Sequence, residues 1–141
     1  MTIVVFDTNT ILSAIYWPRS TGRRCLAGLA RRQYAIALSR EVFNEYEAVV
    51  ADFQRRIPAC NSAGELSWLR LKAHWFETVS LGKGRSRDPK DDPFPACALA
   101  ARAKYIVTRD KDLLVLGKPF GIQIITPSRF LVSLRVLQQS D

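Results

Sequence analysis

Long apolar runs are missing from this chain of 141 residues. A membrane-spanning helix needs about 20 consecutive apolar residues, and no run in the sequence approaches that length. The amino-terminal segment lacks a basic leader and reaches Asp7 too soon for a signal peptide. We therefore expect a protein without a membrane segment that resides in the cytoplasm.

Cysteine and histidine are also scarce. Cys25, Cys60 and Cys97 show no CxxC spacing, which argues against both a disulfide framework and a zinc site. The one histidine, His74, has no nucleophile or acid at a recognisable spacing. We interpret it as a structural or surface residue, and we expect a reducing compartment.

Acidic residues are the minority charge: 13 Asp and Glu stand against 21 Lys and Arg, for a net charge of +8. Arginines cluster between positions 19 and 32 and again at 55 and 56. A basic surface of this kind either keeps a protein soluble or attracts a polyanion, since guanidinium groups match phosphate geometry. The acids gather instead between positions 88 and 112, which suggests a metal site within a phosphate-attracting surface.

Strands and helices are predicted to alternate along the chain. Short β-branched apolar runs predict strands over residues 2–6, 34–38, 77–81, 105–108 and 121–125. Helical periodicity and capping residues predict helices over residues 8–16, 22–33, 40–53, 62–75, 96–104, 110–116 and 128–137. This alternation implies a single α/β domain over residues 1–141, with a parallel sheet covered on both faces.

Carboxylates follow two of the predicted strands where each strand ends. Asp7 follows the first strand, and Asp110 follows the strand at 105–108. Because sites in open α/β sheets form at the carboxyl ends of strands, we expect these two residues to meet in one cleft. Each one alone also has the simpler role of a helix N-cap. Gathered carboxylates repel one another, and a hard cation such as Mg²⁺ or Mn²⁺ compensates for this.

Four segments strengthen this interpretation, and they occur in the order Val5-Phe6-Asp7-Thr8-Asn9, Ser39 through Glu45, Asp88-Pro89-Lys90-Asp91-Asp92, and Ile106-Val107-Thr108-Arg109-Asp110-Lys111-Asp112-Leu113-Leu114. Together, over almost the whole chain, they resemble the PIN-domain nucleases, and most of all the VapC-like toxins of toxin–antitoxin pairs. The resemblance implies a three-layer α/β/α sandwich with a central parallel sheet. It also implies a Mg²⁺- or Mn²⁺-dependent endoribonuclease that acts on RNA, binds an antitoxin protein and forms a homodimer or higher oligomer.

The resemblance assigns roles to individual residues. The catalytic and metal-binding acids that it implies are Asp7, Glu45, Asp91 and Asp110, with Asp112 as a supplementary ligand. It also implies that Asn9 and Thr108 hold these acids by hydrogen bonds. Asp91 is preferred to Asp92 because Phe94 and Ala98 follow it at the family's spacing. For Glu45 alone, a solvated helix residue is the simpler interpretation.

The chain departs from the family pattern in two places. Arg109 stands where glycine is frequent, and it either contacts substrate phosphate or points to solvent. Pro93 and Pro95 fall where the family usually runs freely into a helix, so we expect a distorted helix start near Asp91.

Two other functions compete with the nuclease. A phosphatase of the haloacid-dehalogenase kind also begins with Asp after its first strand, but it needs a second Asp where Asn9 stands. A non-catalytic RNA-binding or regulatory module with the PIN fold is the other alternative, and Arg109 and the prolines favour it.

Overall fold

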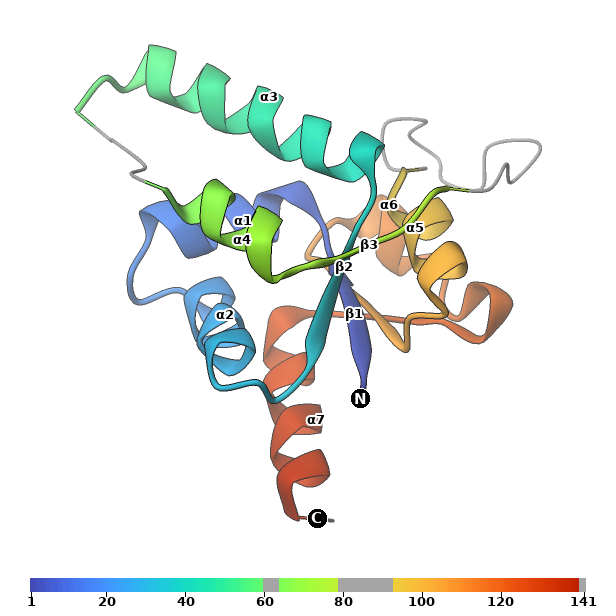
Figure 1. Cartoon of the computed structure of the whole chain (residues 1–141). Coiled ribbons are helices and arrows are strands. Elements are labelled where there is room, and N and C mark those ends of the chain that lie inside the picture. The colour runs from blue at the N-terminus through green and yellow to red at the C-terminus, as the bar shows by residue number, and fades with distance from the viewer. Residues whose placement is uncertain (60–63, 79–92, 140–141) are drawn as a thin grey trace.

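Five short strands form one parallel sheet in the computed structural model, which describes residues 1–59, 64–78 and 93–139. The strands lie in the order β3-β2-β1-β4-β5, and every pairing between them is parallel. Their bounds are β1 (Ile3–Phe6), β2 (Ala35–Leu38), β3 (His74–Trp75), β4 (Tyr105–Val107) and β5 (Gln123–Ile125). All carboxyl ends therefore lie along one side of the sheet, which we call the carboxyl edge (Figure 1).

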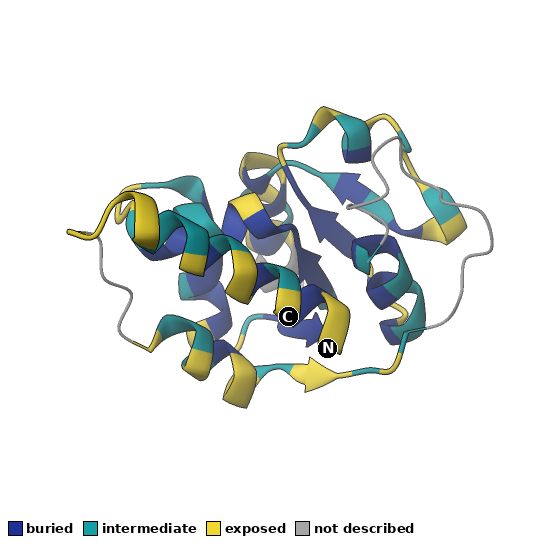
Figure 2. Cartoon of the chain, turned by 90° about the horizontal axis from the view of Figure 1, so that it is seen from above, coloured by how far each residue is buried: buried dark blue, intermediate teal, exposed yellow. Residues whose placement is uncertain are grey.

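Helices cover both faces of this sheet. On one side α1 packs against α2, and α2 packs against α7, while α5 packs against β1, β2 and β4 on the other. Figure 2 shows the buried strands between these layers. The helices are α1 (Thr8–Tyr16), α2 (Thr21–Ala30), α3 (Arg40–Arg56), α4 (Glu65–Lys72), α5 (Pro93–Ala101), α6 (Lys111–Leu114) and α7 (Pro127–Gln139). The predicted three-layer α/β/α sandwich is confirmed.

Helix α3 occupies a particular place in this arrangement. It contacts both α1 and α5, and it runs across the top of the view in Figure 1, where the carboxyl ends of β1 and β2 point.

Among the helices of the described residues, we find none with the length and apolar character required to cross a bilayer.

An aromatic cluster joins the carboxyl-terminal helix to the sheet. Phe130 on α7 is fully buried, and its ring centroid lies 5.0 Å from that of Tyr34 and 5.8 Å from those of Phe6 and Tyr105. All three contacts are edge-to-face, the arrangement that ring quadrupoles favour. Helix α7 is therefore part of the core that surrounds β1.

The junction between α1 and α2 is close-packed and held by an arginine. A Cβ atom on Gly22 would lie 2.7 Å from the carbonyl oxygen of Thr10, so only glycine permits this approach. The Arg23 guanidinium donates to the carbonyl oxygens of Ala14 and Ile15, which lie in the last turn of α1. These carbonyls have no partner within the helix, so Arg23 stabilises the fold and is not simply part of a basic surface.

The prediction of a strand at 77–81 was wrong within the described residues. Strand β3 instead covers His74–Trp75, next to Leu38 of β2, and residues 76–78 are not in a strand. Helix α4 consequently ends at Lys72 and not near Trp75. Its predicted cap, Ser62, lies outside the described residues. The error arose because the apolar spacing from Trp68 to Trp75 was interpreted as one helix face, whereas Leu71 is 84% exposed.

The predicted start of a helix at residue 96 was also wrong, and the distortion expected near Asp91 falls outside the described residues. Helix α5 begins at Pro93, three positions earlier than predicted. Pro93 and Pro95 both lie in its first turn, where a backbone N–H has no partner within the helix and its absence costs little. The two prolines are therefore compatible with a regular start of α5.

Candidate active site

The register of β1 and β4 places Asp7 beside Thr108. Phe6 pairs with Val107, so the next residue of each strand emerges at the same point on the carboxyl edge. The Asp7 N–H donates to the Val107 carbonyl over 3.1 Å. The Thr108 hydroxyl donates to Oδ2 of Asp7 over 2.5 Å, and both residues are buried.

The same hydroxyl links Asp7 to Asp110. The Asp110 N–H donates to Oγ1 of Thr108 over 2.9 Å, so one threonine touches the side chain of the first acid and the backbone of the second. The two strand-end acids, a hundred positions apart in sequence, are neighbours in the fold. The role of Thr108 in holding metal-binding acids stays a prediction.

Both acids also cap helices. Asp7 Oδ1 accepts from the Thr10 N–H over 2.9 Å at the start of α1, and Asp110 Oδ1 accepts from the Asp112 N–H over 2.8 Å at the start of α6. A capping bond occupies only one acceptor position of a carboxylate, which has about four. The capping role and a ligand role are therefore compatible, and the caps fix the orientation of each side chain.

Burial raises the pKa of Asp7 above its ordinary value. Hydrogen bonds from Thr10 and Thr108 oppose this rise, and the negative charge of Asp110 adds to it. The folded chain thus places a desolvated carboxylate next to a second acid. A divalent cation between them would remove this electrostatic cost.

A pH dependence follows from the raised pKa of Asp7. Because the folded state holds the proton of Asp7 more tightly than the unfolded state, this residue stabilises the fold at low pH. Its contribution to the free energy of unfolding is lost as the pH rises from the ordinary pKa of Asp through the raised pKa of the folded state. In metal-free buffer near neutral pH, we expect Asp7→Asn to raise the melting temperature by roughly 2–4 °C, the shift that about 1 kcal/mol produces in a domain of this size. Thermal unfolding at several pH values measures this difference, which should vanish at low pH. A variant less stable than the wild type at neutral pH would contradict the electrostatic interpretation.

Tyr46 is a site residue that sequence reasoning missed. It lies on α3 and is fully buried, and its hydroxyl donates to the Phe6 carbonyl over 2.5 Å. Phe6 is the last residue of β1 and directly precedes Asp7, so Tyr46 holds the backbone at the end of the strand. The sequence does contain one signal for this role, because a tyrosine within an apolar helix stripe needs a partner for its hydroxyl once it is buried.

We expect Tyr46→Phe to lower the free energy of unfolding by about 1–3 kcal/mol, since it leaves the buried Phe6 carbonyl without this donor. Urea denaturation measures the loss. Tyr34→Phe is the matched control, because the Tyr34 hydroxyl donates to the Cys25 carbonyl over 2.7 Å and is equally buried. Only Tyr46→Phe should also reduce catalytic activity. Equal activity in the two variants would show that Tyr46 stabilises the fold without positioning Asp7.

The other predicted metal ligands and Asn9 lie on α1, α3 and α6 or outside the described residues. Glu45 is half-buried on α3, and Asn9 is exposed on the first turn of α1. Asp112 is half-buried on α6. Asp91 and Asp92 lie outside the described residues. In residues 1–59, 64–78 and 93–139, no three Asp, Glu, His or Cys side chains come close enough to hold one metal ion.

The Arg109 side chain contacts the start of α2. It is exposed, and its guanidinium donates to the Thr21 hydroxyl at the start of α2. Its charge is also close enough to Cys25, one turn further along α2, to oppose the rise that burial causes in the thiol pKa. The choice between substrate and solvent was left open by the sequence, and the structure shows Arg109 anchored at the rim of the carboxyl edge.

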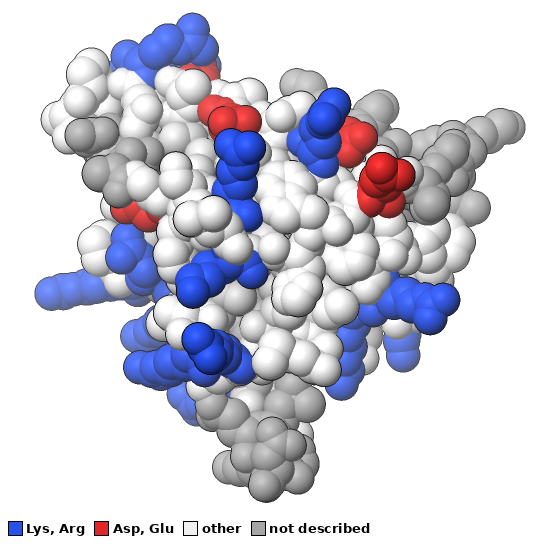
Figure 3. Space-filling view, viewed as in Figure 1, with Lys and Arg blue, Asp and Glu red and all other residues white. Residues whose placement is uncertain are grey.

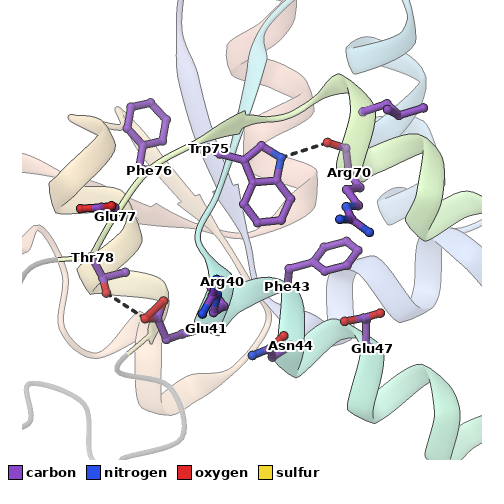
Figure 4. A pocket seen from close by; sticks show the side chains of 11 residues that line it. Arg40, Glu41, Phe43, Asn44, Glu47, Arg70, Trp75, Phe76, Glu77 and Thr78 are labelled. Carbon is purple, nitrogen blue, oxygen red and sulfur yellow. Dashed lines mark hydrogen bonds between the residues drawn. The ribbon is translucent and has the colours of Figure 1, made fainter.

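The largest of the cavities we describe lies elsewhere. It has a volume of about 880 Å³ and is bounded by α3, α4, β3 and the residues that follow β3 (Figure 4). Glu41 accepts a hydrogen bond from Thr78 in this cavity, and Trp75 donates to the Arg70 carbonyl. Neither Asp7 nor Asp110 lines it. Its size alone therefore does not make it the active site.

Comparison with known proteins agrees with this geometry. A family model described as "PIN domain" matches residues 3–112. The fold is similar to the crystal structure of PAE2754 from Pyrobaculum aerophilum, with a TM-score of 0.65 and 16% identity, over 96% of this chain and 90% of that one. It is also similar to VapBC2 from Rickettsia felis bound to a DNA fragment from their promoter, with a TM-score of 0.60 and 18% identity, over 87% of this chain and 97% of that one. No curated protein matches.

The fold is a parallel α/β sandwich with two carboxylates at the carboxyl edge of its sheet. The chain belongs to the PIN-domain family, whose members are nucleases. The resemblance noted in the sequence is confirmed at the level of this family.

Proposed function

We propose that this protein is a metal-dependent endoribonuclease that hydrolyses RNA phosphodiester bonds. The single observation that carries the proposal is the pairing of Asp7 with Asp110 through Thr108 at the carboxyl edge. Burial raises the pKa of Asp7, and the charge of Asp110 adds to this rise, so a bound cation would stabilise the charged form of Asp7.

The donor chemistry fits Mg²⁺ or Mn²⁺. Both ions prefer oxygen ligands, and Mg²⁺ is commonly held by one or two carboxylates together with water and substrate phosphate. Asp7 and Asp110 supply these carboxylates, and we propose Glu45, Asp91 and Asp112 as the acids that complete the set. Such an ion, when bound, supplies positive charge to the phosphate and orients the attacking water.

The residues around the acids prepare the site for this chemistry. Thr108 and the helix caps fix the carboxylates before any ligand arrives, which avoids reorganisation during the reaction. Arg109 would contact the phosphates of the RNA, and Asn9, on the exposed first turn of α1, would support the acid cluster. The net charge of +8 favours approach of a polyanion.

A role as the toxin of a toxin–antitoxin pair completes the proposal. The similarity in fold to VapBC2 from Rickettsia felis supports it, as does the motif resemblance to VapC-like toxins. The partner would be an antitoxin protein, and the active form would be a homodimer or higher oligomer in the cytoplasm.

The decisive experiment is RNA cleavage with the purified protein under controlled metal content. We expect cleavage of single-stranded RNA with added Mn²⁺ or Mg²⁺, none with EDTA, and recovery when Mn²⁺ is restored. Calorimetry should detect Mn²⁺ binding that is lost in the Asp7→Asn, Asp110→Asn double variant. RNA binding without either Mn²⁺ binding or cleavage would contradict the proposal and favour a non-catalytic RNA-binding module.

A further inference from the structure

We infer that a pocket beside the carboxyl edge binds a nucleotide of the RNA next to the bond that is cleaved. The inference rests on the proposed function, because the nucleotide that it places in this pocket belongs to the RNA substrate of that function. The pocket has a volume of about 770 Å³, within the usual range for small-ligand sites. It lies where the junction of α1 and α2 meets the end of β4, and its lining includes Trp17, Arg19, Ser20, Thr21 and Arg109.

Arg109 connects this pocket to the active site. It directly precedes Asp110, and its side chain lines the pocket, so consecutive residues join the pocket to the paired acids. The hydrogen bond to the Thr21 hydroxyl uses one of the five N–H groups of the guanidinium. The side chain is therefore anchored and still has donors for a phosphate. Arg19, which is exposed and also lines the pocket, supplies a second positive charge.

Trp17 gives the pocket an aromatic surface. Its side chain is 49% exposed, and its ring meets Phe53 at 5.6 Å and Tyr16 at 6.4 Å, both edge-to-face. Tyr16 and Phe53 are stacked on each other at 4.4 Å, which makes a firm support for the indole. A half-open aromatic ring beside arginines is the combination that binds single-stranded nucleic acid, with stacking for bases and cations for phosphates.

The charge of the lining distinguishes this pocket from the larger cavity near β3. The larger cavity is lined by three acids and two arginines, namely Glu41, Glu47, Glu77, Arg40 and Arg70. The lining described for the pocket beside Arg109 contains two arginines and no acid. Figure 3 shows that Lys and Arg side chains gather over α2, while the acidic side chains in the upper part of the view lie beside further Lys and Arg. A polyanion is therefore favoured at the pocket beside Arg109.

Binding of a ten-nucleotide oligouridylate tests the inference. The Asp7→Asn protein is used without divalent metal, so that the RNA stays intact. In this background, Trp17→Ala should weaken binding about tenfold, because it removes one stacking surface. Arg109→Ala should also weaken binding. The slope of the logarithm of the binding constant against the logarithm of the salt concentration should become less steep by about 0.7, which corresponds to one phosphate contact on a single strand. Arg135→Ala is the control, since it removes an exposed arginine of α7, and it should change the affinity less than twofold.

Two further measurements separate the possible outcomes. Trp17→Phe should retain most of the affinity, and the indole N–H resonance of Trp17 should shift when RNA is added. Unchanged affinity in both Trp17→Ala and Arg109→Ala, with wild-type protein still cleaving RNA in Mn²⁺, would overturn the pocket and leave the nuclease assignment intact. Absence of both RNA binding and cleavage in the wild type would overturn the proposed function, and the pocket with it.

Discussion

Asp7→Asn is expected to lower metal-dependent RNA cleavage by at least a hundredfold. Losing a residue that only supports a metal ligand already costs up to about a hundredfold in activity, and loss of a ligand itself should cost no less. The substitution keeps the size of the side chain and an oxygen that can accept from Thr10. It removes the negative charge that would bind the cation. We expect the same loss for Asp110→Asn, because the two carboxylates are neighbours that share one hydroxyl contact.

Initial rates of cleavage over a range of Mn²⁺ concentrations measure this effect. Asp52→Asn is the matched control, since Asp52 lies on α3 and forms exposed ion pairs with Arg55 and Arg56. It should leave cleavage unchanged. The Asp7→Asn protein is also expected to be more stable than the wild type without metal, so lost activity could not be attributed to unfolding. Undiminished cleavage in both Asp7→Asn and Asp110→Asn would remove these residues from the active site.

The largest loss of stability is expected for Phe130→Ala, at about 3–5 kcal/mol. Phe130 is fully buried, and its ring contacts Phe6, Tyr34 and Tyr105. Truncation would leave a cavity between α7 and the sheet that rigid strands cannot fill. Urea denaturation followed by circular dichroism measures the loss. Val132→Ala on the same helix is the control, because Val132 is 57% exposed and should change stability by about 0.5 kcal/mol or less.

Phe130→Ala also tests the prediction of a single domain over residues 1–141. The family match ends at residue 112, whereas Phe130 lies beyond it and packs on β1, β4 and the residue before β2. If the chain is one cooperative unit, the variant should unfold in a single transition at lower denaturant. Two separate transitions, with only the second part destabilised, would place a domain boundary before α7.

Local sequence patterns were sufficient for the strands next to the site. The β-branched runs before Asp7 and Asp110 predicted β1 and β4, and the predicted parallel pairing places the carboxyl ends of these strands side by side. These predictions succeeded because buried strands need apolar residues on both faces, which is a local signal. The edge strand β3 failed for the opposite reason: it has only two residues, both exposed, so its sequence carries no such pattern.

The sequence by itself determined the class of fold, the PIN-domain resemblance and the two acids at strand ends, because each depends on residues that are close together in the chain. Only the tertiary structure decided the long-range contacts around the carboxyl edge. The bond from Tyr46 to Phe6 spans 40 positions, the bond from Thr108 to Asp7 spans 101, and the bond from Arg109 to Thr21 spans 88. Such contacts depend on strand register and helix packing, which bring distant residues within about 3 Å of one another.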